Sequence, residues 1–526
     1  MDIADDRHNP HDQLLNHMGL IQPTDMQMEP SNSPVSSANS DQLSQEASQL
    51  LFGTEGHSNT FQADLKAINK QHKDVYNRLH SIFEDSEFVT NVVDRYQPLP
   101  VIANLRCGAW YIDPRITNVD CTAYFKSTDG HDGQWQFSLR RSNLQVLHLI
   151  ISSGGVILVD STRRGKRFPD ALSKTVPSWC AVINTARAKL LNRYPVAPSL
   201  RSAWQPHSSS LGLDTPVNAV RSSEHDQIQR LVDNWADQLL ASSFNVEETL
   251  AQLHRPLKPI WVSPASDLGK EASIGDVNKL DFHPVICLSA SKYLGDHPST
   301  DREGGFNYIQ GAGDDHEGWS RGLTHKLFWD NHHEFLAAHR HELESLIDLI
   351  VSSSLDNTCS NLKRVEVFEV RTTKLFICLP NDFNQNSSSE DALDVIISGG
   401  DSVELRCKKD KIEKKVVVAN NRVMKNLSKT LSSVLPECIQ MMKDSKAVRL
   451  TAIGPKLDES KEIMVAIALC LLVNVFNDHG LHRQEPPKQI EKADIRHRLH
   501  WMIEASKGTL NPPRSILKRV NNYLIG

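Results

Sequence analysis

Two short segments combine carboxylates, hydroxyls and cations in a way that suits phosphate chemistry. They are Lys126-Ser-Thr-Asp-Gly-His131 and Asp160-Ser-Thr-Arg-Arg-Gly-Lys-Arg167. The second segment follows the apolar, mainly β-branched run Val156–Val159, which predicts a buried strand. Because open α/β sheets bind ligands in the loops at the carboxyl ends of their strands, we expect this loop to bind a phosphorylated ligand or RNA. Guanidinium and backbone N–H groups suit phosphate oxygens, and a carboxylate suits Mg²⁺ or a ribose hydroxyl.

The first segment offers groups that could take up a proton beside this loop. Asp129 or His131 would accept the proton, and Lys126 would contact phosphate. Two structural alternatives stay open: a solvated basic loop after an ordinary strand, and a hairpin or tight turn at Asp129-Gly130. The pattern is not a Walker A loop, which would need glycine at position 160 and Ser or Thr at position 167. A kinase or ATPase is therefore disfavoured.

Other clusters of chemically active residues are less specific. Gly311-Ala-Gly-Asp-Asp315 places two carboxylates on a glycine-rich loop, which suits either Mg²⁺ or the acidic start of a helix. The histidines at 332, 333, 339 and 341 do not form H-E-x-x-H, so we expect a solvated helical cluster rather than zinc. A basic segment, Arg406 to Lys429, would favour an RNA-binding surface together with Arg496, Arg498, Arg514, Lys518 and Arg519.

Composition limits the class of protein. The formal net charge of −6 argues against a uniformly basic nucleic-acid binder, so RNA contacts would come from local patches. The longest apolar run, Ile463 to Phe476, is shorter than the roughly 20 residues that span a bilayer. The start of the chain lacks the features of a signal peptide, and the nine cysteines are scattered. We therefore expect a cytosolic protein without a membrane segment.

At 526 residues the chain predicts two or three domains. Residues 1–60 are rich in Ser, Asn, Gln, Asp and Pro, which is typical of a disordered tail. We expect an amino-terminal domain over 61–355, starting with a helix that buries Ile68, Val75, Leu79 and Ile82. A smaller α/β domain over 365–526 would contain strands at 374–379 and 447–453, helices at 427–442 and 463–476, and two closing helices. Of the closing helices, one would bury Ile495, Leu499, Met502 and Ile503, and the other would be capped by Asn511.

Several long motifs together resemble one enzyme family, the initiator-tRNA phosphoribosyl transferases. The motifs are Cys107-Gly-Ala-Trp-Tyr, Tyr124-Phe-Lys-Ser-Thr-Asp-Gly-His131, Gln134-Trp-Gln-Phe-Ser-Leu-Arg-Arg141, Val159-Asp-Ser-Thr-Arg-Arg-Gly-Lys-Arg167, Pro169-Asp-Ala-Leu-Ser-Lys-Thr-Val-Pro177, Tyr308-Ile-Gln-Gly-Ala-Gly-Asp-Asp315, Trp319-Ser-Arg-Gly-Leu-Thr324 and Asn511-Pro-Pro-Arg-Ser-Ile-Leu-Lys-Arg-Val-Asn-Asn-Tyr-Leu. The resemblance extends from about residue 62 to residue 526.

The resemblance implies transfer of ribosyl phosphate from phosphoribosyl pyrophosphate to a 2′-hydroxyl of initiator methionine tRNA, on the T-stem adenosine at tRNA position 64. It implies an α+β amino-terminal catalytic domain and a smaller α/β domain like dual-specificity phosphatases, with Mg²⁺ as cofactor. Asp129, His131 and Asp160 are then the candidates for base or metal roles, with Asp160, Asp314 and Asp315 as candidate metal ligands. The candidate substrate-binding residues are Lys126, Ser127, Thr128, Arg140, Ser161, Thr162, Arg163, Arg164, Gly165, Lys166, Arg167, Lys174, Gly454, Lys456 and Ser460.

The chain departs from the family in the phosphate loop of the carboxyl-terminal domain. Thr451 stands where the family's Cys-x-x-Gly-Lys-Asp-x-Ser loop has cysteine, and Pro455 interrupts the loop. Thiolate phosphatase chemistry is therefore disfavoured, while Gly454, Lys456 and Ser460 keep backbone and cation contacts available. The alternatives to a transferase are a catalytically inactive tRNA-binding protein and a phosphatase-related enzyme.

Overall fold

The computed structural model describes most of the chain after residue 73. The described ranges are 74–117, 119–163, 165–193, 212–266, 275–295, 300–302, 304–357, 365–380, 392–399, 414–419, 427–453, 457–485 and 487–526. All described residues belong to one compact unit, 67–526. The tail expected over 1–60 and the start of the first helix, with Ile68, lie outside the described residues.

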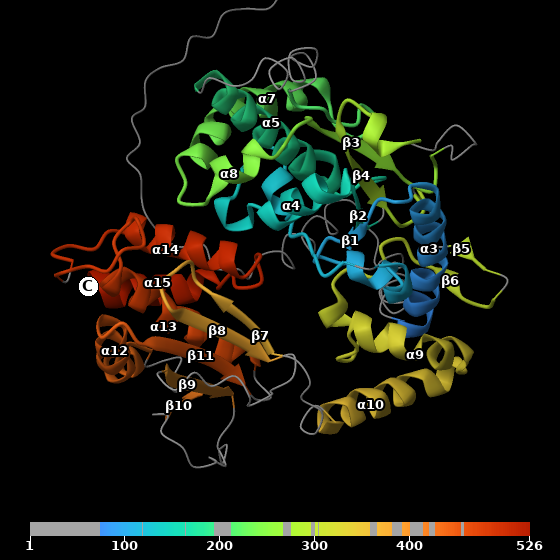
Figure 1. Cartoon of the computed structure of the whole chain (residues 1–526). Helices are drawn as coiled ribbons and strands as arrows, with labels where there is room; N and C mark the ends of the chain where they lie inside the picture. Colours follow the sequence, from blue (N-terminus) through green and yellow to red (C-terminus); the bar gives the residue numbers. More distant parts are fainter. Residues whose placement is uncertain are drawn as a thin grey trace, which may run out of the picture. The chain divides into compact units, whose positions relative to one another are not determined.

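A four-stranded parallel sheet organises the amino-terminal half (Figure 1). Its order is β1-β2-β4-β3, with strands Val101–Ala103, Val156–Asp160, His283–Ser289 and Leu257–Val262 respectively. Every residue of β2 and β4 is buried, as expected for strands covered on both faces. The buried strand predicted at Val156–Val159 is confirmed.

Alternate residues of the central strand pack into two separate cores. Val156 and Leu158 belong to one core with residues of α4 (Leu144–Ser153), α5 (Val176–Arg193), α7 (Ser222–Leu240) and α8 (Val246–Ala251). Ile157 and Val159 belong to the other, with α3 (Val75–Arg95), α9 (His325–Ala337) and α10 (Arg340–Asn357). Because successive side chains of a strand point to opposite faces, these cores cover the two sides of the sheet and give an α/β fold.

Short elements connect this framework. They are the 3₁₀ helices η1 (Gly108–Tyr111), η2 (Pro114–Ile116), η3 (Ser127–Gly130), η4 (Leu139–Arg141), η7 (Val277–Lys279) and η8 (His316–Gly318), the π-helix η5 (Ala171–Thr175), and the paired strands β5 (Thr300–Asp301) and β6 (Asn307–Tyr308). The tight turn considered at Asp129-Gly130 is therefore the end of η3.

The carboxyl-terminal half contains a second sheet, of order β10-β9-β11-β8-β7, in which only β7 runs antiparallel to its neighbour. The strands are Lys414–Ala419, Ala392–Gly399, Ala447–Ile453, Leu375–Pro380 and Val365–Glu369. The helices are α12 (Leu427–Lys443), α13 (Leu457–Val475), α14 (Lys492–Ala505) and α15 (Arg514–Ile525). The four predicted elements are present as β8, α12, β11 and α13, whereas β7, β9 and β10 were not predicted. The fold class is α/β in this half too.

The apolar helix α13 is the core of this half. Its residues from Ile463 to Val473 are all buried, because α12, α14, α15 and the sheet surround it. The apolar run in α13 therefore packs inside the protein. Among the described helices, none is both long and apolar enough to cross a membrane.

Three expectations about single residues were wrong. Asn511 does not cap α15, whose N-cap is Pro513, because its side chain is hydrogen-bonded to Arg140. His332 is buried rather than solvated, with Nδ1 2.7 Å from the Trp329 carbonyl oxygen. Arg498 does not contribute to a basic surface, since it is fully buried and donates to Asp478. Most of the basic segment 406–429 lies outside the described residues.

A substitution at Gly108 would test how closely the loop after β1 packs against the sheet. A Cβ atom at Gly108 would lie 2.1 Å from the carbonyl oxygen of Val159, whereas one at Gly318 would have nothing within 4 Å. Both glycines are in 3₁₀ helices and neither has a positive φ. We expect Gly108→Ala to lower the free energy of unfolding by about 3 kcal/mol and Gly318→Ala to change it little, as measured by urea unfolding. Equal effects of the two substitutions would contradict this packing.

Candidate active site at the carboxyl ends of the parallel strands

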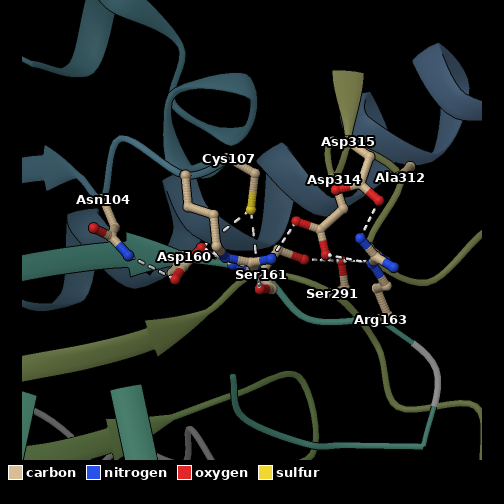
Figure 2. A network of polar contacts seen from close by, with 12 residues as sticks. Asn104, Cys107, Asp160, Ser161, Arg163, Ser291, Ala312, Asp314 and Asp315 are labelled. Carbon is tan, nitrogen blue, oxygen red and sulfur yellow. Dashed lines mark hydrogen bonds and ion pairs between the residues drawn. The ribbon is translucent and has the colours of Figure 1, made fainter. Parts of the chain in front are cut away.

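Three neighbouring strands deliver polar side chains to one edge of the first sheet. β1 leads into Asn104, β2 ends at Asp160, and β4 leads into Ser291. The parallel register pairs Asp160 with Ser289 and Val159 with Ala103, so the three ends coincide. Figure 2 shows the resulting polar network. It lies where open parallel sheets bind ligands.

Asp160 lies at the centre of this network and is fully buried. Its carboxylate accepts hydrogen bonds from Asn104 Nδ2 at 2.8 Å, Cys107 Sγ at 3.1 Å and the Ser161 backbone N–H at 2.8 Å. Burial raises the pKa of Asp160, and the charge of Arg106 and these hydrogen bonds oppose that rise. The side chain thus joins the ends of β1 and β2.

Arg106 connects Asp160 to a distant loop. Its guanidinium lies 3.3 Å from Asp160 Oδ1 and also donates to Asp314 Oδ1 and to the Ser161 carbonyl oxygen. Burial lowers the pKa of Arg106, but the surrounding acidic groups raise it overall, so the side chain stays charged. A guanidinium therefore holds two buried aspartates together across this edge of the sheet.

The three predicted metal ligands are placed in an ion-pair network rather than in a coordination shell. Arg106 contacts both Asp160 and Asp314, and Arg163 contacts Asp314 and Asp315. Asp315 is 70% exposed. In the part of the chain that the structure describes, no three His, Cys, Asp or Glu side chains converge as metal ligands. These residues do not fit a protein-held Mg²⁺ ion.

The loop after β2 holds most of the predicted substrate-binding residues. Ser161 and Thr162 are buried, and Ser161 Oγ lies 2.6 Å from Ser291 Oγ. Arg163 is 63% exposed, so its guanidinium is accessible despite its pairing with Asp315. Lys166 and Arg167 follow, and Gly165 has a φ of 86° and open space around it. Arg164 lies outside the described residues. We call this segment, residues 161–167, the cationic loop. It has a buried base and an exposed, positively charged tip.

The segment from Gln310 to Asp315 packs against the backbone of this loop. Gln310 Nε2 donates to the carbonyl oxygens of Arg163 at 3.1 Å and Lys166 at 2.8 Å. Gly311 has a φ of 71°, and a Cβ there would lie 2.7 Å from the Thr162 carbonyl oxygen. Glycine is required here for two reasons, because both the backbone conformation and the close approach exclude a side chain.

A buried carboxylate from α3 completes the support. Asp85 accepts hydrogen bonds from Ser291 Oγ and from the Tyr308 hydroxyl, each at 2.7 Å. Burial raises the pKa of Asp85 to about 8, and these two hydrogen bonds oppose the rise. Because Ser291 also contacts Ser161, Asp85 links α3 to the base of the cationic loop.

The segment 126–131 lies beside this loop. Asp129 is buried and accepts two hydrogen bonds from Arg141, at 2.9 and 2.7 Å, and one from Gln136 at 2.9 Å. Lys126 and Thr128 are exposed, and Ser127 has a buried hydroxyl without a hydrogen-bond partner. His131 is 47% exposed, and its Nε2 lies 3.8 Å from Asp170 Oδ2. Of the three candidate catalytic residues, His131 is thus the accessible one.

Lys174 is held in place rather than free for substrate. Its Nζ lies 2.7 Å from Glu224 and 3.2 Å from Asp170. Burial lowers the pKa of Lys174, but the two carboxylates outweigh it and raise the value overall. Lys174 therefore ties η5 to α7 through Asp170 and Glu224.

Comparison with known proteins identifies the family. The family model described as "Rit1 N-terminal domain" matches residues 68–352, and the one described as "Rit1 DUSP-like domain" matches residues 403–524. A Saccharomyces cerevisiae protein named tRNA A64-2′-O-ribosylphosphate transferase is 31% identical over 88% of this chain and 94% of its own length. The chain belongs to the Rit1 family.

Another similar protein is an uncharacterized protein of Schizosaccharomyces pombe. It is 39% identical over 56% of this chain, and the match covers 61% of that protein. No solved structure matches the chain. The Rit1 assignment agrees with the sequence-based resemblance and with the phosphatase-like fold expected for the carboxyl-terminal half.

The remaining predicted site residues of this Rit1 chain make other contacts, are buried, or lie outside the described residues. Arg140 donates to Asn511 Oδ1 at 3.0 and 2.6 Å, so it ties η4 to the segment before α15. Ser460 is buried in the first turn of α13. Gly454 and Lys456 are outside the described residues. Thr451 is buried within β11, two residues before the strand ends.

Sequence reasoning missed the residues that hold the Rit1 site together. They are Asp85, Asn104, Arg106, Cys107, Asp170, Glu224, Ser291 and Gln310. Only Asp170, Cys107 and Gln310 stood inside motifs quoted for the family resemblance. The rest are single polar residues outside these motifs, and most of them are far apart in the chain.

The raised pKa of Asp85 predicts a pH dependence of stability. The folded protein keeps this proton up to about pH 8, whereas the unfolded chain releases it near pH 4. Stability from this group is therefore fully present below pH 4 and is lost as the pH rises towards 8. We expect Asp85→Asn to flatten the decline of unfolding free energy between pH 5 and 8, measured by urea unfolding.

The matched control is Asp348→Asn, because a hydrogen bond from Arg321 lowers the pKa of Asp348. That group contributes nothing to the slope between pH 5 and 8. An unchanged slope in Asp85→Asn would show that Asp85 does not carry the proton in this range.

Proposed function

We propose that this chain transfers a 5-phosphoribosyl group from phosphoribosyl pyrophosphate to the 2′-hydroxyl of adenosine 64 in initiator methionine tRNA. The observation that carries the proposal is the alignment with the S. cerevisiae tRNA A64-2′-O-ribosylphosphate transferase across both halves of the chain. The cationic loop at the ends of the parallel strands supplies a matching site. The comparisons give no support to the alternative of a catalytically inactive tRNA-binding protein.

The transfer replaces one bond to the anomeric carbon with another. The ribose 2′-oxygen forms a bond to C1′ of the donor, the C1′–oxygen bond to diphosphate breaks, and diphosphate leaves with the electron pair. The exposed cations of the loop, Arg163 and Lys166, would bind the negative charge that grows on the leaving group. Arg106 would not contact the donor, since Asp160, Asp314 and Ser161 occupy its guanidinium.

His131 is the residue we assign to take the proton from the 2′-hydroxyl. Asp129 is buried against Arg141, and Asp160 is buried among Asn104, Cys107 and Arg106. His131 alone among these three candidates has its side chain half exposed. In A-form RNA, 2′-hydroxyls face the wide and shallow minor groove, so a stem nucleotide can meet an exposed base without leaving the helix.

Mg²⁺ enters this proposal only as a counterion of the diphosphate. The aspartates at 160, 314 and 315 are paired with arginines, so we route no step through a protein-held metal. We also propose a cytosolic location. Each of the seven cysteines in the described segments is a free thiol, as expected in a reducing compartment.

The test is incubation of the purified chain with Mg²⁺, labelled phosphoribosyl pyrophosphate and unmodified initiator tRNA, with elongator methionine tRNA in parallel. We expect label on the initiator only. Arg163→Ala should lower the rate by about 10²-fold, because it removes a cation from the leaving group. The control is Arg115→Ala, an exposed arginine paired with Asp113 in η2.

Wild-type protein that binds initiator tRNA but transfers no label would contradict the proposed activity. Equal rates for Arg163→Ala and Arg115→Ala would instead show that the donor binds elsewhere.

A further inference from the structure

We infer that Asp170 is a positioning residue that orients His131 for proton transfer. This inference rests on the proposed function and adds a residue to the acceptor side of the site. Asp170 is not one of the predicted site residues. It is the N-cap residue of η5, and η5 leads directly into the helix α5, which packs against the sheet.

Three cationic or basic groups converge on the Asp170 carboxylate. Oδ2 lies 2.7 Å from Lys166 Nζ and 3.8 Å from His131 Nε2, and Oδ1 lies 3.2 Å from Lys174 Nζ. The Asp170 side chain is 12% exposed, while those of His131 and Lys166 are about half exposed. The carboxylate is therefore largely buried, whereas His131 and Lys166 reach the surface.

The backbone around His131 is also held against Asp170. The Thr175 hydroxyl donates to the Lys126 carbonyl oxygen at 3.2 Å. A Cβ at Gly130 would lie 3.0 Å from the Asp170 carbonyl oxygen and 2.9 Å from Thr175 Oγ1. Because η3 and the start of η5 are this close, the backbone that carries His131 is held near the Asp170 carboxylate.

The π-helical geometry of η5 has its own anchor. Leu172 lies within η5, and its carbonyl oxygen accepts a hydrogen bond from Trp261 Nε1 of β3 at 2.8 Å. Single π-helical turns occur often at functional sites. This contact fixes η5, and hence Asp170, to the sheet.

The charges around Asp170 leave part of its negative charge available to His131 during the reaction. Lys174 has a second carboxylate partner, Glu224, at 2.7 Å. Glu224 also accepts from Trp135 Nε1 at 3.1 Å, so it is fixed on the far side of Lys174. When His131 takes up a proton, the Asp170 carboxylate, 3.8 Å from its Nε2, can pair with the new positive charge. A carboxylate in this role also fixes the imidazole ring.

The proton balance of the step is simple. The 2′-hydroxyl gives its proton to His131 Nδ1 as the oxygen–C1′ bond forms, while Nε2 stays towards Asp170. Diphosphate departs with the electrons of its bond to C1′. Asp170 exchanges no proton and touches neither substrate.

A double-mutant cycle separates this role from a structural one. The proteins are wild type, His131→Ala, Asp170→Asn and the double variant, and kcat and KM for phosphoribosyl pyrophosphate are measured with initiator tRNA. We expect His131→Ala to lower kcat by about 10²-fold or more, because a general base is lost. Asp170→Asn should lower kcat at least about tenfold in the wild-type background and not at all in His131→Ala. KM should stay unchanged in each.

The matched control is Asp237→Asn, which removes an exposed carboxylate 2.7 Å from Lys189 Nζ, far along the chain in α7. Its kcat should equal that of the wild type. Thermal unfolding of each variant checks folding. If Asp170→Asn does not fold, Asp170→Glu keeps the charge for the flexible lysines but displaces it from the ring, and should lower kcat at constant KM.

Several results would overturn the inference. An equal loss from Asp170→Asn in both backgrounds would show that Asp170 acts independently of His131. A rise in KM with unchanged kcat would show that it acts on donor binding through Lys166. An unchanged kcat in His131→Ala would show that His131 is not the general base. Wild-type protein without transfer would instead refute the proposed function.

Discussion

The site depends on the ion pairs that the guanidinium of Arg106 makes with Asp160 and Asp314. This guanidinium joins the loops that follow β1 and β2 to the loop that precedes η8. Two buried carboxylates this close would repel each other without a cation between them, and the cost of burying an unpaired charge is several kcal/mol. Arg106 therefore permits the acidic cluster to exist and fixes the base of the cationic loop.

The cationic loop, with its rigid base and exposed tip, is suited to group transfer. Asp85, Ser291, Gln310 and Gly311 immobilise the backbone of the loop, while Arg163 and Lys166 stay accessible. Cations in fixed positions stabilise developing charge without reorganising during the reaction. The acceptor side is built in the same manner, since Asp170 is fixed by η5 and holds His131 at the surface.

Sequence patterns predicted the elements whose residues are close together in the chain. The run Val156–Val159, the apolar helix α13 and the loop after β2 were identified from local periodicity and composition. Arg106, Asp85 and Ser291 could not be, because each is a lone polar residue whose side-chain partners lie 54 to 223 positions away. The same limitation applies to the prediction of metal ligands, because the partners of these residues are also distant in the chain. Asp314 and Asp315 have the composition of a Mg²⁺ site, and only the fold shows that arginines pair with them.

Urea unfolding with and without EDTA tests most directly whether Arg106 is the cation that holds the site together. The comparison includes wild type, Arg106→Gln, and Arg106→Gln combined with Asp314→Asn. We predict that Arg106→Gln lowers the unfolding free energy by about 3–5 kcal/mol, because two buried carboxylates lose their partner. Asp314→Asn should restore part of that loss, and neither EDTA nor Mg²⁺ should affect the wild type. A stable Arg106→Gln variant, or a wild type that Mg²⁺ alone stabilises, would contradict the account.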